Sequence, residues 1–409
     1  MKILCLCTKF PHPPKDGGTM AMLSMIRGFY RAGHEVTVLT MNTPKHYVTL
    51  SSIPVEVRIM AEFHAVDVNT QVNVFDAMAN LFFSRESYHV LRFTSRPFRD
   101  ELERLLNLKQ YDVIQLETLY MAPYISTIRK MNSKALISLR AHNIENEIWR
   151  RRAQNSTNPI KEYYFYVTAN RIRNYEEMVF SANQFDVVIP ITGRDSRIIK
   201  ELGVKKPVFV SEAGIDADAL DKREVKMEHP SLFYIGSLDW EPNREGIDWF
   251  LKEVWPTISR TYPKVKFYLA GRNMPESYHK LANDQLVVLG EVENAAQLIK
   301  SKSIMIVPIL SGSGMRVKIV EGMAYGKAIV ATTMAAEGMG VRHNQHILLA
   351  DKPDRFINAI SVLIEKRSML DTIGFQARKF CEDRFDNDKI VGRLLKFYQD
   401  QLGKGKKSG

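Results

Sequence analysis

Two cationic side chains and one carboxylate stand at helical spacing between Met315 and Gly326. Arg316 and Lys318 fall in the first turn of the helix that this stretch predicts, where acidic residues are more usual. Because the first N–H groups of a helix lack partners and carry partial positive charge, phosphate binds well at such a place. The two added cations therefore indicate an anionic ligand. Glu321, one turn further on, can accept hydrogen bonds from the hydroxyls of a sugar or a ribose.

A strand and a bare loop precede this helix. The apolar run from Ile304 to Leu310 has the length of a buried strand in a parallel sheet. Ser311-Gly-Ser-Gly314 follows, and its small side chains let a ligand approach the backbone. The helix is expected to end at Gly326, and Ala328–Ala331 predicts the next buried strand. An alternative stays open, in which this is an ordinary strand and helix layer with solvated cations and a glutamate paired to a lysine.

The run Gly-Ser-Gly-Met-Arg-Val-Lys-Ile-Val-Glu-Gly-Met-Ala-Tyr-Gly, with Ala-Glu-Gly after it, resembles the donor-binding signature of glycosyltransferase family 4. Enzymes of this family are retaining, need no metal and have the GT-B fold. The resemblance implies that Glu321 is a catalytic residue that holds the donor ribose. The first of the family's two signature glutamates is replaced here by Ser313, as in the branch with a Gly-Ser-Gly-x-Arg loop. The residues implied to hold the donor pyrophosphate are Ser313, Gly314, Met315, Arg316 and Lys318.

A second strand, loop and helix open the chain. Ile3–Cys7 predicts a strand, Met20–Ala32 a helix, and Gly17 and Gly18 lie in the loop between them. Open α/β sheets bind ligands at the carboxyl ends of their strands, although a plain surface loop is also consistent with a Gly-Gly pair. The pattern resembles the N-domain glycine loop that faces the donor in this family, which implies that Gly17 and Gly18 contact the donor.

Two further polar residues follow predicted strands. Glu117 ends a strand that begins at Asp112, where its carboxylate can meet an acceptor hydroxyl or cap the next helix. His142 follows the strand Ala135–Leu139 within Arg-Ala-His-Asn-Ile-Glu. A lone histidine is more often a structural residue. This run, however, resembles the family's N-domain histidine motif, which implies a catalytic role for His142 beside the donor sugar.

The second half of the chain repeats the pattern at a strand from Ser231. Gly236 and Ser237 follow this strand and let a phosphate approach the backbone, and Arg244 at the next helix start can supply charge. In the family this loop binds the diphosphate through a basic residue, to which Arg244 is an approximate match. The resemblance also places the nucleobase against the backbone near Val292.

Strands alternate with helices along the whole chain, which predicts α/β architecture with parallel sheets covered on both faces. Together with the resemblance this gives the GT-B fold, two doubly wound Rossmann-like domains facing a central cleft. The expected N-terminal acceptor-side domain covers residues 1–207, and the nucleotide-sugar-binding domain covers residues 208–384. A helix over residues 385–402 is expected to cross back to the first domain, followed by a basic tail over residues 403–409. Val55–Met60 is predicted to be a further strand.

Composition limits the classes of function. The formal net charge of +11 calls for an anionic partner, but the basic residues are scattered and lack the aromatic or zinc framework of a nucleic-acid module. An anionic membrane surface fits better, and the amphipathic segment Val72–Phe93, with its Phe82-Phe83 pair, is either core or a surface that docks on lipid. The three cysteines suit a reducing cytoplasm and offer no metal set. We expect a cytoplasmic protein, at the inner face of the membrane where it meets lipid.

The sequence thus predicts a retaining hexosyltransferase that moves a sugar from a nucleotide diphosphate donor to a glycan or lipid-linked acceptor in surface polysaccharide or glycoconjugate synthesis. No metal or other cofactor is expected, and no nucleic acid. A nucleotide-sugar epimerase of GT-B fold is the alternative. A dinucleotide-dependent oxidoreductase is disfavoured, because the first strand is not followed by Gly-x-Gly-x-x-Gly.

Overall fold

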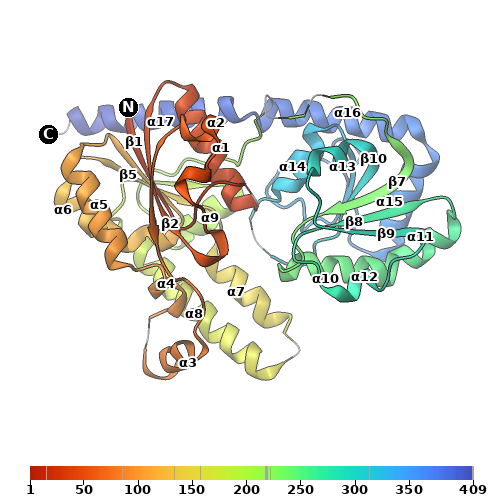
Figure 1. Ribbon diagram of the computed structural model, residues 1–409, viewed down its shortest axis with the longest axis horizontal. Helices are drawn as coiled ribbons and strands as arrows, with labels where there is room; N and C mark the ends of the chain where they lie inside the picture. Colours follow the sequence, from red (N-terminus) through yellow and green to blue (C-terminus); the bar gives the residue numbers. More distant parts are fainter. Residues whose placement is uncertain are drawn as a thin grey trace. The chain divides into compact units, whose positions relative to one another are not determined.

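The computed structural model describes residues 1–14, 16–84, 86–132, 134–156, 158–216, 220–221, 223–312 and 314–407. The chain divides into two compact units (Figure 1). Unit 1 comprises Met1–Gly214 and Asn387–Gly409, and unit 2 comprises Ile215–Asp386. Unit 1 therefore extends beyond the expected boundary at residue 207. The reason is that the segment after Pro207 stays hydrogen-bonded to strand β6, through Phe209 N to Val188 O and Ser211 N to Pro190 O.

Unit 1 is built on a six-stranded parallel sheet with the order β3-β2-β1-β4-β5-β6. Its strands are β1 Lys2–Cys7, β2 Glu35–Asn42, β3 Glu62–Asp67, β4 Val113–Glu117, β5 Leu136–Ala141 and β6 Val187–Pro190. The connecting helices are α1 Gly17–Arg31, η1 Pro44–His46, η2 Leu50–Ser52, α2 Val55–Arg58, α3 Val74–Phe83, α4 Tyr88–Leu91, α5 Arg96–Leu108, η3 Leu119–Tyr124, α6 Ile125–Met131, α7 Glu145–Gln154, α8 Pro159–Ala182 and α9 Gly193–Glu201. The last helix of the chain, α17 Asn387–Lys407, also belongs to this unit.

Both faces of the unit 1 sheet are buried, as expected for parallel strands. In β1, Ile3 and Cys5 pack into one core with α1 and α17, while Leu4 and Leu6 pack into the other. Helix α17 lies close to α1 because Gly28 has no side chain: a β-carbon there would stand 2.9 Å from Val391 Cβ. The C-terminal helix is thus an integral part of the unit 1 core.

Unit 2 contains a second six-stranded parallel sheet, with the order β12-β11-β10-β7-β8-β9. Its strands are β7 Glu228–Ile235, β8 Lys266–Ala270, β9 Leu286–Gly290, β10 Lys302–Val307, β11 Ala328–Ala331 and β12 Leu348–Leu349. Its helices are α10 Glu241–Trp249, the π-helix η4 Phe250–Val254, α11 Trp255–Thr261, α12 Glu276–His279, α13 Ala295–Ser301, α14 Val317–Ala324, α15 Pro353–Glu365 and α16 Arg367–Arg384.

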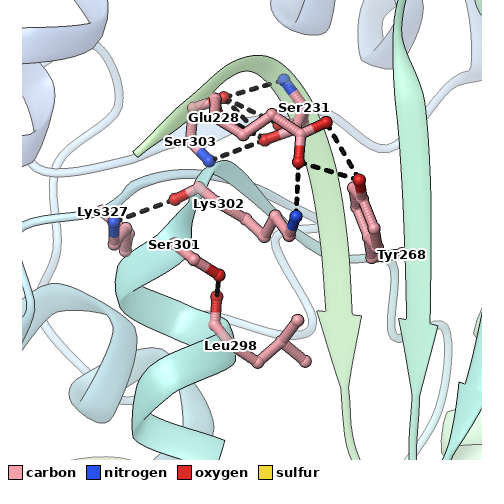
Figure 2. A network of polar contacts seen from close by, with 8 residues as sticks. All are labelled: Glu228, Ser231, Tyr268, Leu298, Ser301, Lys302, Ser303 and Lys327. Atoms are coloured by element: carbon pink, nitrogen blue, oxygen red, sulfur yellow. Dashed lines mark hydrogen bonds and ion pairs between the residues drawn. The ribbon is translucent and has the colours of Figure 1, made fainter. Parts of the chain in front are cut away.

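A polar cluster ties together the amino ends of β7, β8 and β10 (Figure 2). The Glu228 carboxylate accepts hydrogen bonds from Tyr268 Oη at 2.8 Å and from Lys302 Nζ. Lys327 Nζ donates to the carbonyl of Lys302 at 2.9 Å. These contacts lie away from the carboxyl ends of the strands, where the loops after β7 and β10 begin.

Three predicted elements differ from the structure. Val55–Met60 is not a strand, because Pro54 starts the short helix α2 there and the edge strand β3 comes afterwards. The strand expected to reach Leu310 ends at Val307, since Pro308 has no N–H with which to continue the ladder. Helix α1 begins at Gly17 rather than Met20, because Asp16 and Thr19 form a capping box.

Candidate active site

The loop between β10 and α14 wraps around the guanidinium of Arg316. Gly312 and Gly314 have φ values of 103° and 85°, which favour glycine, and a β-carbon on Gly312 would press on Arg316 Nη2 at 3.0 Å. Arg316 stands at the N-cap of α14 and donates to the carbonyl of Gly314 at 2.7 Å. Ser313, which was expected to contact the pyrophosphate, lies outside the described residues. The loop is thus shaped around a buried cation.

Lys318 lies in the first turn of α14 beside this loop. Its amine donates to Tyr234 Oη at 2.8 Å and to Asn243 Oδ1 at 3.0 Å. Burial, with a smaller effect from the charge of Arg316, lowers the pKa of Lys318 to about 7. Neither hydrogen-bond partner carries a negative charge. A bound anion would supply that charge and favour the protonated amine.

The β7–α10 loop meets the α14 loop at this point. Gly236 leaves room for the amine of Lys318, because a β-carbon there would collide with Lys318 Nζ and come within 2.8 Å of Tyr234 Oη. Ser237 is held through its carbonyl by Asn243 Nδ2 at 2.7 Å, and its hydroxyl donates to Asp239. The structure therefore brings Gly236, Ser237, Arg316 and Lys318 together.

Glu321 follows one turn after Lys318 and is partly buried. Among the described residues, none donates a hydrogen bond to its carboxylate, and burial raises its pKa. Because its carboxylate oxygens accept no hydrogen bond from these residues and lie one turn after Lys318, they are suited to accept hydrogen bonds from the hydroxyls of a ligand. Met315 precedes the helix and is likewise partly buried.

The remaining residues predicted for the donor lie further from this group. Arg244 is on α10 but exposed, and within the described part of the chain no hydrogen bond joins it to the two loops. Asn243, its neighbour, provides the contact to Lys318 instead. Val292 is half-buried in the turn after β9, at the same carboxyl edge of the sheet but two strands from β7.

In unit 1, the predicted loop glycines Gly17 and Gly18 are the first two residues of α1. Asp16 caps this helix and forms an ion pair with Lys9 at 2.7 Å. Although burial raises the pKa of Asp16, Lys9 outweighs it and brings the pKa to about 2. The helix end is therefore already occupied by a carboxylate, and Lys9, which sequence reasoning missed, supplies the local positive charge.

Glu117 and His142 form a buried hydrogen-bonded pair at the carboxyl ends of β4 and β5. His142 Nε2 lies 2.5 Å from Glu117 Oε2, and Arg140 Nη1 lies 3.2 Å from the same oxygen. Burial raises the pKa of Glu117, but Arg140 and His142 outweigh burial and hold it at about 2. Thr118, the next residue, has a φ of 103°, a strained conformation of the kind found at functional sites.

This arrangement corrects the prediction for Glu117. Its side chain is only 1% exposed and its oxygens are occupied by Arg140, His142 and Gln115, so it does not present a carboxylate to an acceptor hydroxyl. The other hypothesis, that it caps the following helix, is also wrong, because η3 has no side-chain cap. Arg140 belongs to the histidine motif, but the sequence does not indicate its contact with Glu117, because that contact crosses between neighbouring strands.

Comparisons with known proteins identify the kind of protein that this chain resembles. Residues 229–366 match the family model described as "Glycosyl transferases group 1". An uncharacterised 44.6 kDa protein in the cps region of Klebsiella pneumoniae is 23% identical, over 97% of this chain and 99% of its own. The phosphatidyl-myo-inositol mannosyltransferase of Mycobacterium tuberculosis is 23% identical over 47% of this chain, which spans about half (54%) of that relative.

Solved structures show the same fold. Sucrose-phosphate synthase from Thermosynechococcus elongatus superposes with a TM-score of 0.73 at 14% identity, covering 99% of this chain and 100% of its own. Anabaena Alr3699/HepE in complex with UDP-glucose superposes with a TM-score of 0.66 at 14% identity, covering 98% and 100%. The predicted GT-B fold is confirmed, and with the family match the chain is a glycosyltransferase. The epimerase alternative is not favoured, since the family model and the named curated relative are transferases.

Proposed function

We propose that the chain is a retaining glycosyltransferase of family 4 that moves a hexose from a nucleoside diphosphate sugar to a glycan or lipid-linked acceptor. The observation that carries this proposal is the pair of loops after β7 and β10, which converge on Lys318 and Arg316 at the start of α14. The relatives' names support it, because one is a mannosyltransferase and one neighbour is in complex with UDP-glucose.

The residues of these loops account for departure of the leaving group. Negative charge grows on the diphosphate as its bond to the sugar breaks, and Arg316 and Lys318 place positive charge at the N-terminus of α14. Because positive charge is supplied by the protein, no divalent cation is needed to neutralise the diphosphate. Within unit 2, Glu321 accepts from the ribose hydroxyls. The role of His142 in unit 1, a contact with the donor sugar, rests on the family resemblance.

Retention and metal independence are tested together. Purified enzyme is given UDP-glucose and an acceptor extract with and without a chelator, and the anomeric coupling constant of the product is measured by NMR. The proposal expects equal rates and an α-linked product from the α-linked donor. Loss of activity in the chelator, or an inverted linkage, would show that the reaction has been misassigned.

For the acceptor, we propose a lipid-linked molecule at an anionic membrane, in the synthesis of a surface polysaccharide or glycoconjugate. Helix α3 carries Phe75 and Phe83, which are 86% and 90% exposed, and α8 carries Ile160, which is 80% exposed. Figure 1 shows α3 beside α8 within unit 1, and Arg171 of α8 donates to the carbonyl of Leu81 at 2.8 Å. The side chain of Phe82 lies outside the described residues.

A groove of about 540 Å³ lies in the same region of unit 1. Its apolar lining comes from α4, the η3–α6 segment and α8, including Val90, Pro123, Ile125 and Met178. This volume is within the usual range of small-molecule binding sites, and the apolar part of the lining can contact a hydrocarbon chain. It therefore supports a role in holding the apolar part of the acceptor. In the described part of the chain, no helix is long and apolar enough to cross a membrane.

Vesicle flotation tests the membrane surface. Vesicles with anionic lipid should carry the protein upward at low salt more than zwitterionic vesicles do, because each basic residue near such a surface adds roughly 1 kcal/mol. The double variant Phe75→Ser/Phe83→Ser should lose most of this binding. Phe375→Ser, at a phenylalanine of unit 2 that is 65% exposed, is the control. Absence of binding at low salt, or equal losses in both variants, would contradict the proposal.

A further inference from the structure

Five buried side chains form one continuous hydrogen-bonded chain from the C-terminal helix to His142. Tyr398 of α17 lies 2.7 Å from Ser138 Oγ and donates to Gln115 Oε1 at 2.8 Å. Gln115 Nε2 donates to Glu117, whose other oxygen meets His142 Nε2. Tyr398 and Ser138 are completely buried, and so is Gln115.

The direction of each hydrogen bond follows from which atoms can donate. Arg140 can only donate, and the Glu117 carboxylate that it neutralises can only accept. Gln115 turns its amide N–H₂ to Glu117, so its oxygen faces Tyr398. Because the single proton of Tyr398 goes to Gln115, Ser138 must donate to Tyr398. All protons therefore point toward Glu117, and His142 must place a proton on Nε2.

We propose that Tyr398, Gln115 and Glu117 are positioning residues that hold His142 in the Nε2–H tautomer and leave its Nδ1 lone pair to accept a hydrogen bond from the donor sugar. This inference rests on the proposed function for its consequence in catalysis. It gives α17, which follows unit 2 in the chain, a direct connection to the site in unit 1. Among the described residues, no hydrogen bond is made to His142 Nδ1.

A neutral imidazole is required for this role, since a protonated one has no acceptor. The charged groups that face His142 are Glu117 of β4, Arg140 of β5 and Lys9 of the segment after β1. Burial lowers the pKa of His142, Glu117 opposes this effect, and Arg140 and Lys9 add to it. The activity should therefore be present at neutral pH and fall as the pH drops through a value below 6.5.

The tautomer is measured directly by NMR on protein labelled with ¹⁵N-histidine, without any substrate. The ten histidines are sorted with a His142→Gln variant, which removes one signal. The proposal expects a protonated Nε2 and an unprotonated Nδ1 for His142 at pH 7.5. A proton on Nδ1 would overturn it. This NMR measurement does not depend on activity. If no sugar transfer is found, the proposed function fails, and the tautomer of His142 still decides whether the hydrogen-bonded chain positions the imidazole.

Two variants test the consequence for catalysis. Glu117→Gln can both donate to and accept from the imidazole, so His142 should show mixed tautomers and kcat should fall on the order of 100-fold with KM for the donor little changed. Because this variant leaves the buried Arg140 uncompensated and can fail to fold, Tyr398→Phe provides the second test. It removes one hydroxyl at the far end of the chain and should lower kcat about 10-fold.

Tyr124→Phe is the matched control for Tyr398→Phe. Tyr124 is also a fully buried tyrosine of unit 1, and its hydroxyl donates to the carbonyl of Phe93 at 2.8 Å, away from His142. Both variants lose one buried hydroxyl that donates one hydrogen bond and accepts another, since Tyr124 Oη also accepts from Ser95 N at 2.9 Å, and both should lower the melting temperature similarly. Only Tyr398→Phe should change the NMR signals of His142 and the rate. Equal effects of the two variants on rate, or unchanged His142 signals in Tyr398→Phe, would overturn the proposal.

Discussion

The buried amine of Lys318 should make binding of a nucleotide sugar depend on pH. In the free protein its pKa is about 7, because burial and, to a smaller extent, the charge of Arg316 disfavour the protonated amine. A bound diphosphate favours the charged amine and raises this pKa, so binding takes up a proton and weakens as the pH rises. The charged fraction of the free amine falls from about 0.9 at pH 6 to about 0.1 at pH 8, which predicts an affinity roughly tenfold lower at pH 8.

Isothermal titration with UDP-glucose measures this effect. The diphosphate of a nucleotide sugar is a diester and does not titrate between pH 6 and 8, so any proton that is taken up binds to the protein. The number of protons is obtained by repeating the titration in two buffers with different ionisation enthalpies. The expected uptake at pH 7 is about half a proton, and Lys318→Met should abolish it. Lys252→Met, at an exposed lysine of unit 2, is the control. An affinity that is constant from pH 6 to 8, or that keeps its pH dependence in Lys318→Met, would refute this account of the amine.

Three further predictions concern single residues. Gly236→Ala should push Lys318 away from the ligand and weaken binding of a nucleoside diphosphate about 10- to 100-fold, measured by calorimetry, whereas Gly392→Ala, which meets no atom within 4 Å, should not. Glu321→Ala should weaken nucleotide sugar binding without lowering the free energy of unfolding, since the carboxylate is partly buried without a donor; a large loss of stability would assign Glu321 a structural role. Gly28→Ala should destabilise the protein by about 1–3 kcal/mol in urea unfolding, because the added carbon meets Val391; an unchanged midpoint would show that α17 packs less closely on α1.

The sequence pattern predicted the repeated strand and helix architecture because each element carries its own periodicity. The β10–α14 unit was predictable for the same reason: loop glycines, cations and Glu321 follow one another within the segment. Helix α14 has only eight residues, and strand β10 ends before Pro308. The observed ends of both elements therefore differ by a few positions from the predicted ones. The assignment of Val55–Met60 failed because a short apolar run fits a strand or a helical turn equally well.

The unit 1 site could be predicted only in part, since its contacts depend on pairing between distant segments. Glu117 was placed correctly at the end of a strand, yet its partner Arg140 lies on the neighbouring strand and is fixed by their register. Tyr398 is separated from Gln115 by 283 positions, and no local pattern connects them. Helix α17 has the usual spacing of an amphipathic helix, which predicts that one face is buried. The spacing does not indicate which part of the chain that face packs against.

The claim that the loops of unit 2 hold a nucleoside diphosphate has the most direct test in a thermal-shift screen. Wild-type protein is heated with a panel of nucleoside diphosphates and nucleotide sugars, beside the double variant Arg316→Met/Lys318→Met. A ligand that binds only the folded state at 100 times its Kd adds about 2.7 kcal/mol and raises the melting temperature by several degrees. We expect at least one compound to do so with the wild type and none with the variant. No shift with any compound, or equal shifts in both proteins, would contradict the account.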